Sequence, residues 1–397
     1  MEIKSFFEKL NLKPPADCFY NTFLDAEKKY KSSGVFFLED DFVENVCSIC
    51  DCFPNFSGEL KEAAALARKN PDIALYALFV YKAMQDRENF KKHLAEFIFP
   101  TGSTKDYDFL PLLIMLPSIP GLYENLKAHN VPNDIIEATV KQYELCIYLF
   151  EERFDRPGFD KRYFDHMQLY VDAQVLNIDR LRFQIIESLD SPILVLENKE
   201  KELAVLFNGE NINSRGMIKG TPPTDENDNC FYARVEETDD CFIGYRATDK
   251  GVVSNTPERF SKNEWKVVLK QGDSIVGVHI PKNGALTREA CEASYQRARE
   301  VLKNCYPDFS FKAFHCHTWL FDPQLKNFLP PESKILTFQK KYTIFPGETE
   351  GTDVFNFVFK LRFKEYADMP EDTSLQRAIK QHYLDGKYIY EFEGIFL

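Results

Sequence analysis

The hydrophobic pattern of this chain changes between residues 155 and 180, and that change restricts the possible folds more than any other feature. Before it, helix signals recur and glycine is rare, since only four of the 17 glycines lie within residues 1–155. Asn70 and Pro71 form an N-cap and first-turn pair ahead of an apolar helical segment. Asn133 is a candidate N-cap for a second helix, whose apolar positions are Ile136, Val140, Tyr143, Ile147 and Phe150. Residues 1–155 are therefore predicted to form an all-α domain.

Beyond about residue 180, short segments rich in β-branched and aromatic residues alternate with turns, as strands do. These segments are RLRFQII (180–186), ILVLE (193–197), ELAVLF (202–207), CFYARVE (230–236), CFIGYRA (241–247) and WKVVLK (265–270). A strand over 274–281, a helix from Thr287 and a strand within 311–321 predict a βαβ unit with parallel strands. The predicted fold class is α+β, with a helical domain over 1–155, a boundary within RFDRPGF (153–159) and a mixed α/β domain over 156–397.

Composition excludes several classes of partner. The net charge of −13, with no stripe of Lys or Arg, argues against nucleic acid and is compatible with a cationic or amine substrate. No run of 18 apolar residues occurs, so no membrane association is expected. The N-terminus does not read as a signal peptide and the ten cysteines suit a reducing compartment, which together predict a cytoplasmic protein. The sequence does not indicate the oligomeric state.

Two segments rich in cysteine or histidine resemble parts of metal sites. Cys47, Cys50 and Cys52 resemble half of a zinc site, but zinc needs four ligands and no second pair at the usual spacing follows. His315 and His317 offer two imidazoles without a third ligand at a recognisable spacing. We therefore expect structural cysteines and no metal.

The strand, turn and helix over residues 274–300 form a candidate anion site. Strand alternation places Gly277 and His279 on one face, with Val276 and Val278 on the other. Thr287 is a suitable N-cap, and free amides at a helix start behind a glycine-containing turn bind anions well. The helix carries a small-residue stripe, Ala290, Ser294 and Ala298. From spacing alone, a phosphate site and an ordinary strand-to-helix connection both fit.

Three segments resemble a known family. VHIPKNGALTREACEASYQRA (278–298), FHCHTWLFDPQLKNFLPPESKILTFQKKY (314–342) and DTSLQRAIKQHYLDG (372–386) are similar to bacterial proteins described as N-acyltransferases with a GNAT-like C-terminal domain. The helical half before a mixed α/β half also agrees with that family. In the family, the first segment reads approximately His-Ile-Pro-x-Gly-Gly-Pro-Leu. This chain has Asn283, Gly284 and Ala285 where the family has Gly-Gly-Pro.

The resemblance implies acyl-coenzyme A as co-substrate and an amine of a small molecule or peptide as acceptor. SIVGVHIP would be the fourth GNAT strand, KNGALT the pyrophosphate loop and KAFHCHTWL the fifth strand. The two strands would splay, and the pantetheine arm would lie in the gap. The cofactor-binding residues implied are Ile280, Lys282, Asn283, Gly284, Ala285, Leu286 and Thr287.

Amine transfer requires a base for the acceptor and an acid for the leaving thiolate. His279, just before the loop, is the candidate base, although it also fits a histidine hydrogen-bonded within the sheet. His317 is the candidate acid, because many GNAT enzymes carry a tyrosine after the fifth strand and this chain has Trp319 and Phe321 there. Cys316 is either an acyl-accepting nucleophile or a buried, inert thiol.

The remaining polar residues of the resembling segments have local structural explanations. Asp322 with Pro323, and Thr373 with Gln376, read as helix caps. Trp319 and Arg377 are candidate substrate-binding residues, and Arg377 equally fits a surface or interdomain ion pair.

Three functions remain open from the sequence. The first is an acyl-CoA-dependent N-acyltransferase that acts by direct transfer. The second is a catalytically inactive GNAT-like module that binds coenzyme A or another ligand for regulation. The third is a thiol-dependent hydrolase, which requires His or Asp within hydrogen-bond reach of the Cys316 sulfur.

Overall fold

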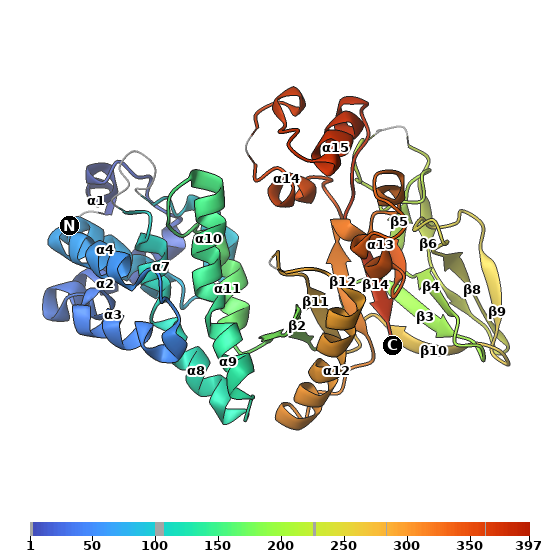
Figure 1. The fold of residues 1–397 in the computed structure, drawn as a ribbon, viewed down its shortest axis with the longest axis horizontal. Coiled ribbons are helices and arrows are strands. Elements are labelled where there is room, and N and C mark those ends of the chain that lie inside the picture. The colour runs from blue at the N-terminus through green and yellow to red at the C-terminus, as the bar shows by residue number, and fades with distance from the viewer. Residues whose placement is uncertain (1–2, 100–106, 225–227, 283, 362) are drawn as a thin grey trace. The chain divides into compact units, whose positions relative to one another are not determined.

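The computed structural model describes residues 3–99, 107–224, 228–282, 284–361 and 363–397. The chain divides into two compact units, Met1–Leu176 and Asn177–Leu397, each described below by itself. The first is helical and the second mixes sheets with helices, which confirms the predicted α+β class (Figure 1). The predicted boundary at residue 155 lies before helix α11 (Tyr163–Val171), whereas the compact units divide after it. Phe164 of α11 packs on Phe90 and Phe99, so its burial belongs to the helical unit.

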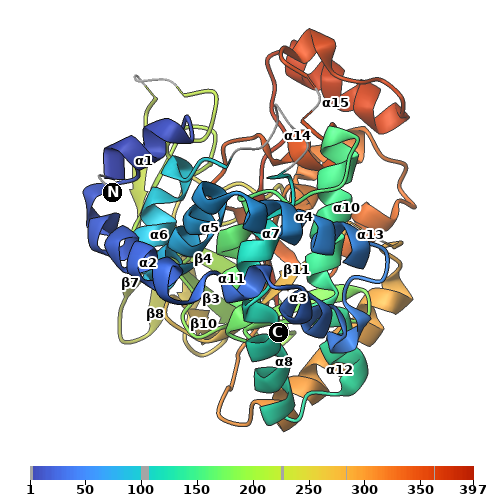
Figure 2. The ribbon, with the colours of Figure 1, turned by 90° about the vertical axis from the view of Figure 1, so that its left-hand side faces the viewer.

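The helical unit is built around α5, which is buried along most of its length. Its α-helices are α1 (Ile3–Lys9), α2 (Tyr20–Ser33), α3 (Asp40–Cys47), α4 (Ser57–Lys69), α5 (Pro71–Ala83), α6 (Arg87–His93), α7 (Leu110–Met115), α8 (Ser118–Ala128), α9 (Asn133–Val140), α10 (Gln142–Phe154) and α11. Helices α2, α4 and α7 pack around α5 (Figure 2). Phe7, Tyr76 and Phe79 form edge-to-face aromatic contacts in this core.

One helix start in this unit was predicted correctly and one was not. The Asn70 side chain accepts hydrogen bonds from the amides of Asp72 and Ile73, at 3.2 and 3.4 Å, which confirms the cap of α5. The prediction for Asn133 was wrong, because α9 begins at Asn133 itself, after Pro132, with no side-chain cap. The expected long helix is two helices, α9 and α10, joined at Lys141.

The second unit, together with the first two residues of β1, contains two main sheets. In the first, which we call the central sheet, the strand order is β1 (Val175–Ile178), β2 (Leu181–Ile186), β11 (Ile275–His279), β12 (Phe314–Thr318), β14 (Phe392–Phe396), β13 (Thr343–Pro346). In the second, the order is β10 (Lys266–Lys270), β3 (Ile193–Glu197), β4 (Leu203–Phe207), β8 (Cys241–Arg246), β7 (Glu236–Glu237), with β9 (Glu258–Ser261) beside β8. Strands β5 (Glu210–Ile212) and β6 (Phe231–Ala233) pair separately.

The predicted βαβ unit is confirmed, since β11 and β12 pair in parallel on either side of α12 (Arg288–Cys305). Helix α12 lies along the central sheet (Figure 1), where Tyr295 contacts the rings of Phe314 and Phe396. Ser294 and Ala298, from the small-residue stripe, are fully buried. The small side chains therefore let the helix approach the sheet closely.

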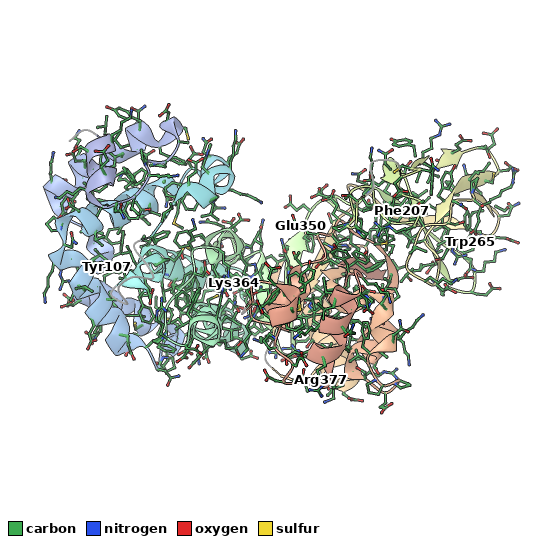
Figure 3. The ribbon with its side chains drawn as sticks, turned by 90° about the horizontal axis from the view of Figure 1, so that it is seen from above. Tyr107, Phe207, Trp265, Glu350, Lys364 and Arg377 are labelled. Carbon is green, nitrogen blue, oxygen red and sulfur yellow. The ribbon has the colours of Figure 1, made fainter. Side chains whose placement is uncertain are left out.

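The opposite face of the central sheet is partly covered by the second sheet. Ile275, Phe345 and Ile395 form one apolar cluster with Val195 and Phe207 of the second sheet. Figure 3 labels Phe207 of β4 and Trp265, which directly precedes β10. The central sheet is therefore buried on its α12 face and only partly buried on the other, and the uncovered part carries the polar residues described below.

The C-terminal part adds α13 (Lys334–Gln339), α14 (Asp353–Phe357) and α15 (Ser374–Leu384). The predicted capping box at α15 is confirmed, because Gln376 Oε1 accepts from the Thr373 amide at 2.9 Å while Thr373 Oγ1 accepts from the Gln376 amide. None of the described helices is both long and apolar enough to cross a bilayer.

Asp322 anchors this C-terminal part to the central sheet. As predicted, it caps a short helix with Pro323 in the first turn, here the 3₁₀ helix η7 (Pro323–Asn327). Its buried carboxylate accepts from the amides of Gln324 and Tyr390, each at 2.8 Å, and thus joins η7 to the residues just before β14. Burial raises the pKa of Asp322 to about 6, against hydrogen bonds that lower it.

This shift predicts a pH-dependent stability for the Asp322→Asn variant. The folded-state pKa lies above the ordinary 3.8, so the stability that Asp322 contributes is fully present below that value and is lost as the pH rises through about 6. The variant amide turns a donor toward amide donors, and we expect it to destabilise the unit by about 1–3 kcal/mol at pH 4.5. The difference in free energy of unfolding between the variant and the unmodified protein should decrease by about 1–3 kcal/mol by pH 7.

Urea titrations followed by tryptophan fluorescence measure this effect in the correct unit, because both tryptophans, Trp265 and Trp319, lie within Asn177–Leu397. Glu332→Gln, at an exposed acid, is the matched control and should show no pH-dependent difference. A destabilisation by Asp322→Asn that is independent of pH would contradict a raised pKa of Asp322 in the folded protein.

Candidate functional site

The site is built where β11 and β12 part. The two strands pair in parallel only at Val276 with Phe314 and at Gly277 with His315, although each continues for two or three further residues. Both strands are held along their full length by their outer neighbours, β2 and β14. The next residues on the same face are His279 of β11 and His317 of β12, so these two histidines border the gap.

A loop of unsatisfied amides follows β11. Gly284 has φ +82°, a conformation that side chains other than glycine rarely adopt. The Thr287 side chain accepts from the Ala290 amide at 3.3 Å, which confirms the predicted cap. Within the described part of the chain, no protein group accepts a hydrogen bond from the amides of residues 284–289. Such amides at the start of an 18-residue helix form a ready anion site.

The other residues predicted to bind the cofactor surround this loop. Lys282, Gly284 and Ala285 are exposed, Ile280 and Thr287 are half-buried, and Leu286 is buried. Asn283 lies outside the described residues. The carbonyl of Ala285 accepts a hydrogen bond from Arg180 Nε at 3.1 Å, so an arginine from the turn before β2 reaches the loop.

His279 is hydrogen-bonded within the sheet, at the edge of the gap. Its Nε2 lies 2.8 Å from Oε1 of Gln184 on β2. A neutral imidazole held in this way by a side-chain amide is the type of group that acts as a general base. The same register places Arg182 opposite His279.

His315 and Ser191 are both held by Glu393. Nε2 of His315 lies 2.8 Å from Glu393 Oε2, and the Ser191 hydroxyl donates to the same oxygen. Burial raises the pKa of Glu393, but the hydrogen bonds and positive charge of its partners outweigh burial, so the pKa is below the usual value. This buried group fixes β12 and β14 beside the gap.

His317 opens into a separate pocket of about 640 Å³. The pocket is lined mainly by polar and acidic residues, which include His317, Glu348, Glu350, Asp353 and Glu391, together with Lys219. It does not include the loop residues 282–287, so the loop, which follows β11, and the pocket, which includes His317 of β12, are distinct features.

Two carboxyl groups of the pocket have raised pKa values. Partial desolvation raises the pKa of Asp353 even though its side chain reaches solvent, and the charge of His317 opposes that shift. Burial raises the pKa of Glu391, and the charge of Asp353 raises it further. Glu391 accepts hydrogen bonds from the Thr349 hydroxyl and from the Asp353 amide, the latter at 3.0 Å. A cation placed between these carboxylates would relieve their repulsion.

Cys316 lies on the opposite face of the sheet from the histidines. It is 2% exposed, and burial raises its pKa well above the usual value. No described His or Asp is hydrogen-bonded to its sulfur. This environment is that of an inert core thiol, and it lacks the base that a thiol-dependent hydrolase requires.

Of the two residues expected to bind substrate, Trp319 directly follows β12 and Arg377 lies on α15. Trp319 is 7% exposed and packs in an apolar cluster with Leu325 and Ile379. Arg377 is exposed on α15 and donates to the Glu371 carbonyl at 2.6 Å. Figure 3 shows Arg377 well apart from Glu350 of the pocket. Substrate binding by Trp319 and Arg377 stays a prediction.

Among the residues of this site that sequence reasoning missed are Arg180, Gln184 and Glu393. A signal existed for two of them, because Gln184 interrupts the apolar strand RLRFQII and Glu393 interrupts the apolar segment FEGIF. For Arg180 no signal existed, since an arginine in a turn is ordinary. Among the described residues, no group of three or more His, Cys, Asp or Glu is arranged to hold a metal ion.

Comparison with known proteins identifies the family. The model of the GNAT-like C-terminal domain family matches residues 175–396, more than half of the chain. The chain therefore belongs to the family of proteins with a GNAT-like C-terminal domain. The comparison with curated protein sequences found no match.

Several solved structures share the fold across both units. An acyltransferase mutant in complex with octanoyl-CoA aligns with a TM-score of 0.57 and 14% identity, over 89% of this chain and 87% of that one. An acyltransferase in complex with decanoyl-CoA and teicoplanin aligns with a TM-score of 0.53 and 14% identity, over 89% and 98%. An acyltransferase with CoA and 10C-teicoplanin gives 0.54 and 14%, with the same coverage. At this identity the likeness concerns the fold.

The position of Cys316 predicts a low reactivity. In the folded protein, iodoacetamide should modify the exposed Cys18 and Cys230 readily and Cys316 about 100-fold or more slowly. Peptide mass spectrometry after timed labelling measures these rates, and labelling in urea is the control that Cys316 can react. Modification of folded Cys316 as fast as Cys230 would restore it as a candidate nucleophile.

Proposed function

We propose that this protein is an acyl-CoA-dependent N-acyltransferase that transfers an acyl group directly to an amine. The observation that carries the proposal is the parting of β11 and β12 beside a loop of unsatisfied amides, with His279 at the edge of the gap. Membership of the GNAT-like family and the fold shared with acyl-CoA-bound acyltransferases support acyl-CoA as the donor.

In the proposed arrangement, the loop 282–287 and the start of α12 bind the pyrophosphate, and the pantetheine arm lies in the gap. The thioester then lies between His279 and His317. Amides directed at a diphosphate need no reorganisation, because the N-terminus of α12 fixes them. The C–S bond and the incoming amine are thereby held on the uncovered face of the sheet.

The transfer requires two proton movements. The acceptor amine attacks the thioester carbonyl carbon, and His279 takes a proton from it, directly or through a water molecule. The C–S bond breaks, the thiolate of coenzyme A takes a proton for which His317 is the proposed donor, and an amide forms. Gln184 orients the His279 ring through its hydrogen bond with Nε2.

The acidic pocket supports an amine as the acceptor. His317 borders both the gap and the pocket, so an acceptor seated there would reach the thioester from the β12 side. Carboxylates such as Asp353 and Glu391 attract an ammonium group and disfavour an anionic acceptor. The pocket volume of about 640 Å³ admits part of a small molecule or a peptide end.

The His279→Ala variant tests the hypothesis that the protein is an enzyme with His279 as its general base. With acyl-CoA and a responsive amine, we expect turnover to fall by about 10²–10⁴-fold, since the variant lacks the general base. Thiol release, followed with a chromogenic disulfide over a panel of acyl-CoAs and amines, measures the rate. Coenzyme A binding by calorimetry should persist in the variant, which shows that the fold and the donor site are intact.

Unchanged turnover in His279→Ala would contradict the assigned role. Coenzyme A binding by the unmodified protein without thiol release for any acceptor would favour the inactive binding module instead. If the unmodified protein bound no coenzyme A at all, both the acyltransferase hypothesis and the inactive-module hypothesis would be overturned.

A further inference from the structure

Arg180 is placed against the loop that precedes α12. It lies in the turn between β1 and β2, and its Nε donates to the Ala285 carbonyl at 3.1 Å. A Cβ atom on Gly284 would lie 3.7 Å from both Cδ and Nε of Arg180, so the arginine side chain lies close to this glycine. This contact joins segments that are more than a hundred residues apart in the chain.

The Ser294 side chain of α12 fixes this turn. The Arg180 amide donates to Ser294 Oγ at 2.9 Å, and the Ser294 hydroxyl donates to the Ala290 carbonyl one turn earlier. Asp179, the acid next in sequence, pairs with Arg297 at 2.7 Å and is therefore engaged by another arginine. The position of Arg180 thus depends on the helix whose N-terminus forms the loop site.

Arg180 and Arg182 have no anionic partner within the described residues. No carboxylate pairs with either, and Nη1 of Arg180 and Nε of Arg182 are buried without any acceptor. Arg182 is only 9% exposed. Burial lowers the pKa of Arg180, and the nearby charge of Arg182 lowers it further. A half-buried guanidinium (Arg180) beside a buried one (Arg182), with no counterion among the described residues, is costly unless an anion joins them.

We propose that Arg180 binds the pyrophosphate of the acyl-CoA donor and makes the enzyme selective for phosphate-bearing thioesters. This inference rests on the proposed function and adds a ligand residue that lies outside the loop and the helix start. The Arg180 guanidinium lies beside Gly284, the one glycine among the described loop residues. It supplies fixed hydrogen-bond donors and a full positive charge there. Arg182 contributes its charge from the adjacent strand.

A ligand series separates this role from a general effect on the fold. Calorimetric titrations with coenzyme A, 3′-dephospho-coenzyme A and pantetheine compare a full ligand, one that keeps the pyrophosphate and one without phosphates. For Arg180→Ala we expect the Kd for both phosphorylated ligands to rise about 10- to 100-fold, while the Kd for pantetheine stays at the unmodified protein's value. Arg180→Lys, which keeps the charge and loses the fork of donors, should show a smaller rise.

Arg259→Ala is the matched control, because Arg259 is exposed on β9 and pairs with Asp240, so the variant changes the net charge equally. It should bind all three ligands as the unmodified protein does. The Kd for each ligand and the tryptophan fluorescence of each variant, which reports folding, complete the measurement.

Each other outcome overturns a definite statement. An equal loss of pantetheine affinity, or no loss of coenzyme A affinity, would overturn the role of Arg180 alone. A loss confined to coenzyme A, absent for the 3′-dephospho form, would mean that Arg180 contacts the 3′-phosphate and would overturn the pyrophosphate assignment. Failure of the unmodified protein to bind coenzyme A would overturn the proposed function, and this inference with it.

Discussion

The site depends on one constraint, which is that β11 and β12 stop pairing after Gly277 and His315 while each stays fully paired on its outer side. If the parallel ladder continued, no space for a ligand would exist between the strands. Because β2 and β14 hold the two strands rigidly, the gap is part of the sheet and needs no loop movement to form. His279 and His317 occupy fixed positions on either side of it as a result.

The central sheet can carry this gap because its two faces differ. The α12 face is packed with aromatic rings such as Phe314 and Phe396, and Ser294 lets the helix lie close to it. The other face buries polar groups. Their desolvation costs little free energy only because they form hydrogen bonds with one another, as Glu393 does with His315. The packed face thus makes the sheet rigid, whereas the polar face carries the titratable side chains of the site.

Charge is distributed unevenly in a chain whose net charge is −13. Arg180, which contacts the loop, and Arg182, opposite His279, have no anionic partner among the described residues, while carboxylates line the pocket that includes His317. In the proposed function, these opposite potentials sort the substrates, with the anionic donor on one side of the gap and a cationic acceptor on the other. The overall acidity therefore says less about the ligands than the local arrangement of charge does.

The sequence by itself determined the division into a helical and a mixed part, the βαβ unit, the Thr287 cap and the caps at Asp322 and Thr373, because each depends on residues close in the chain. It did not determine β14, whose five residues acquire their role only by pairing between β12 and β13. Nor did it show which polar groups meet. The Gln184 to His279 contact spans 95 positions, and Arg180 reaches Ala285 across 105. Such pairs are set by strand register and by helix-on-sheet packing, which local propensity does not encode.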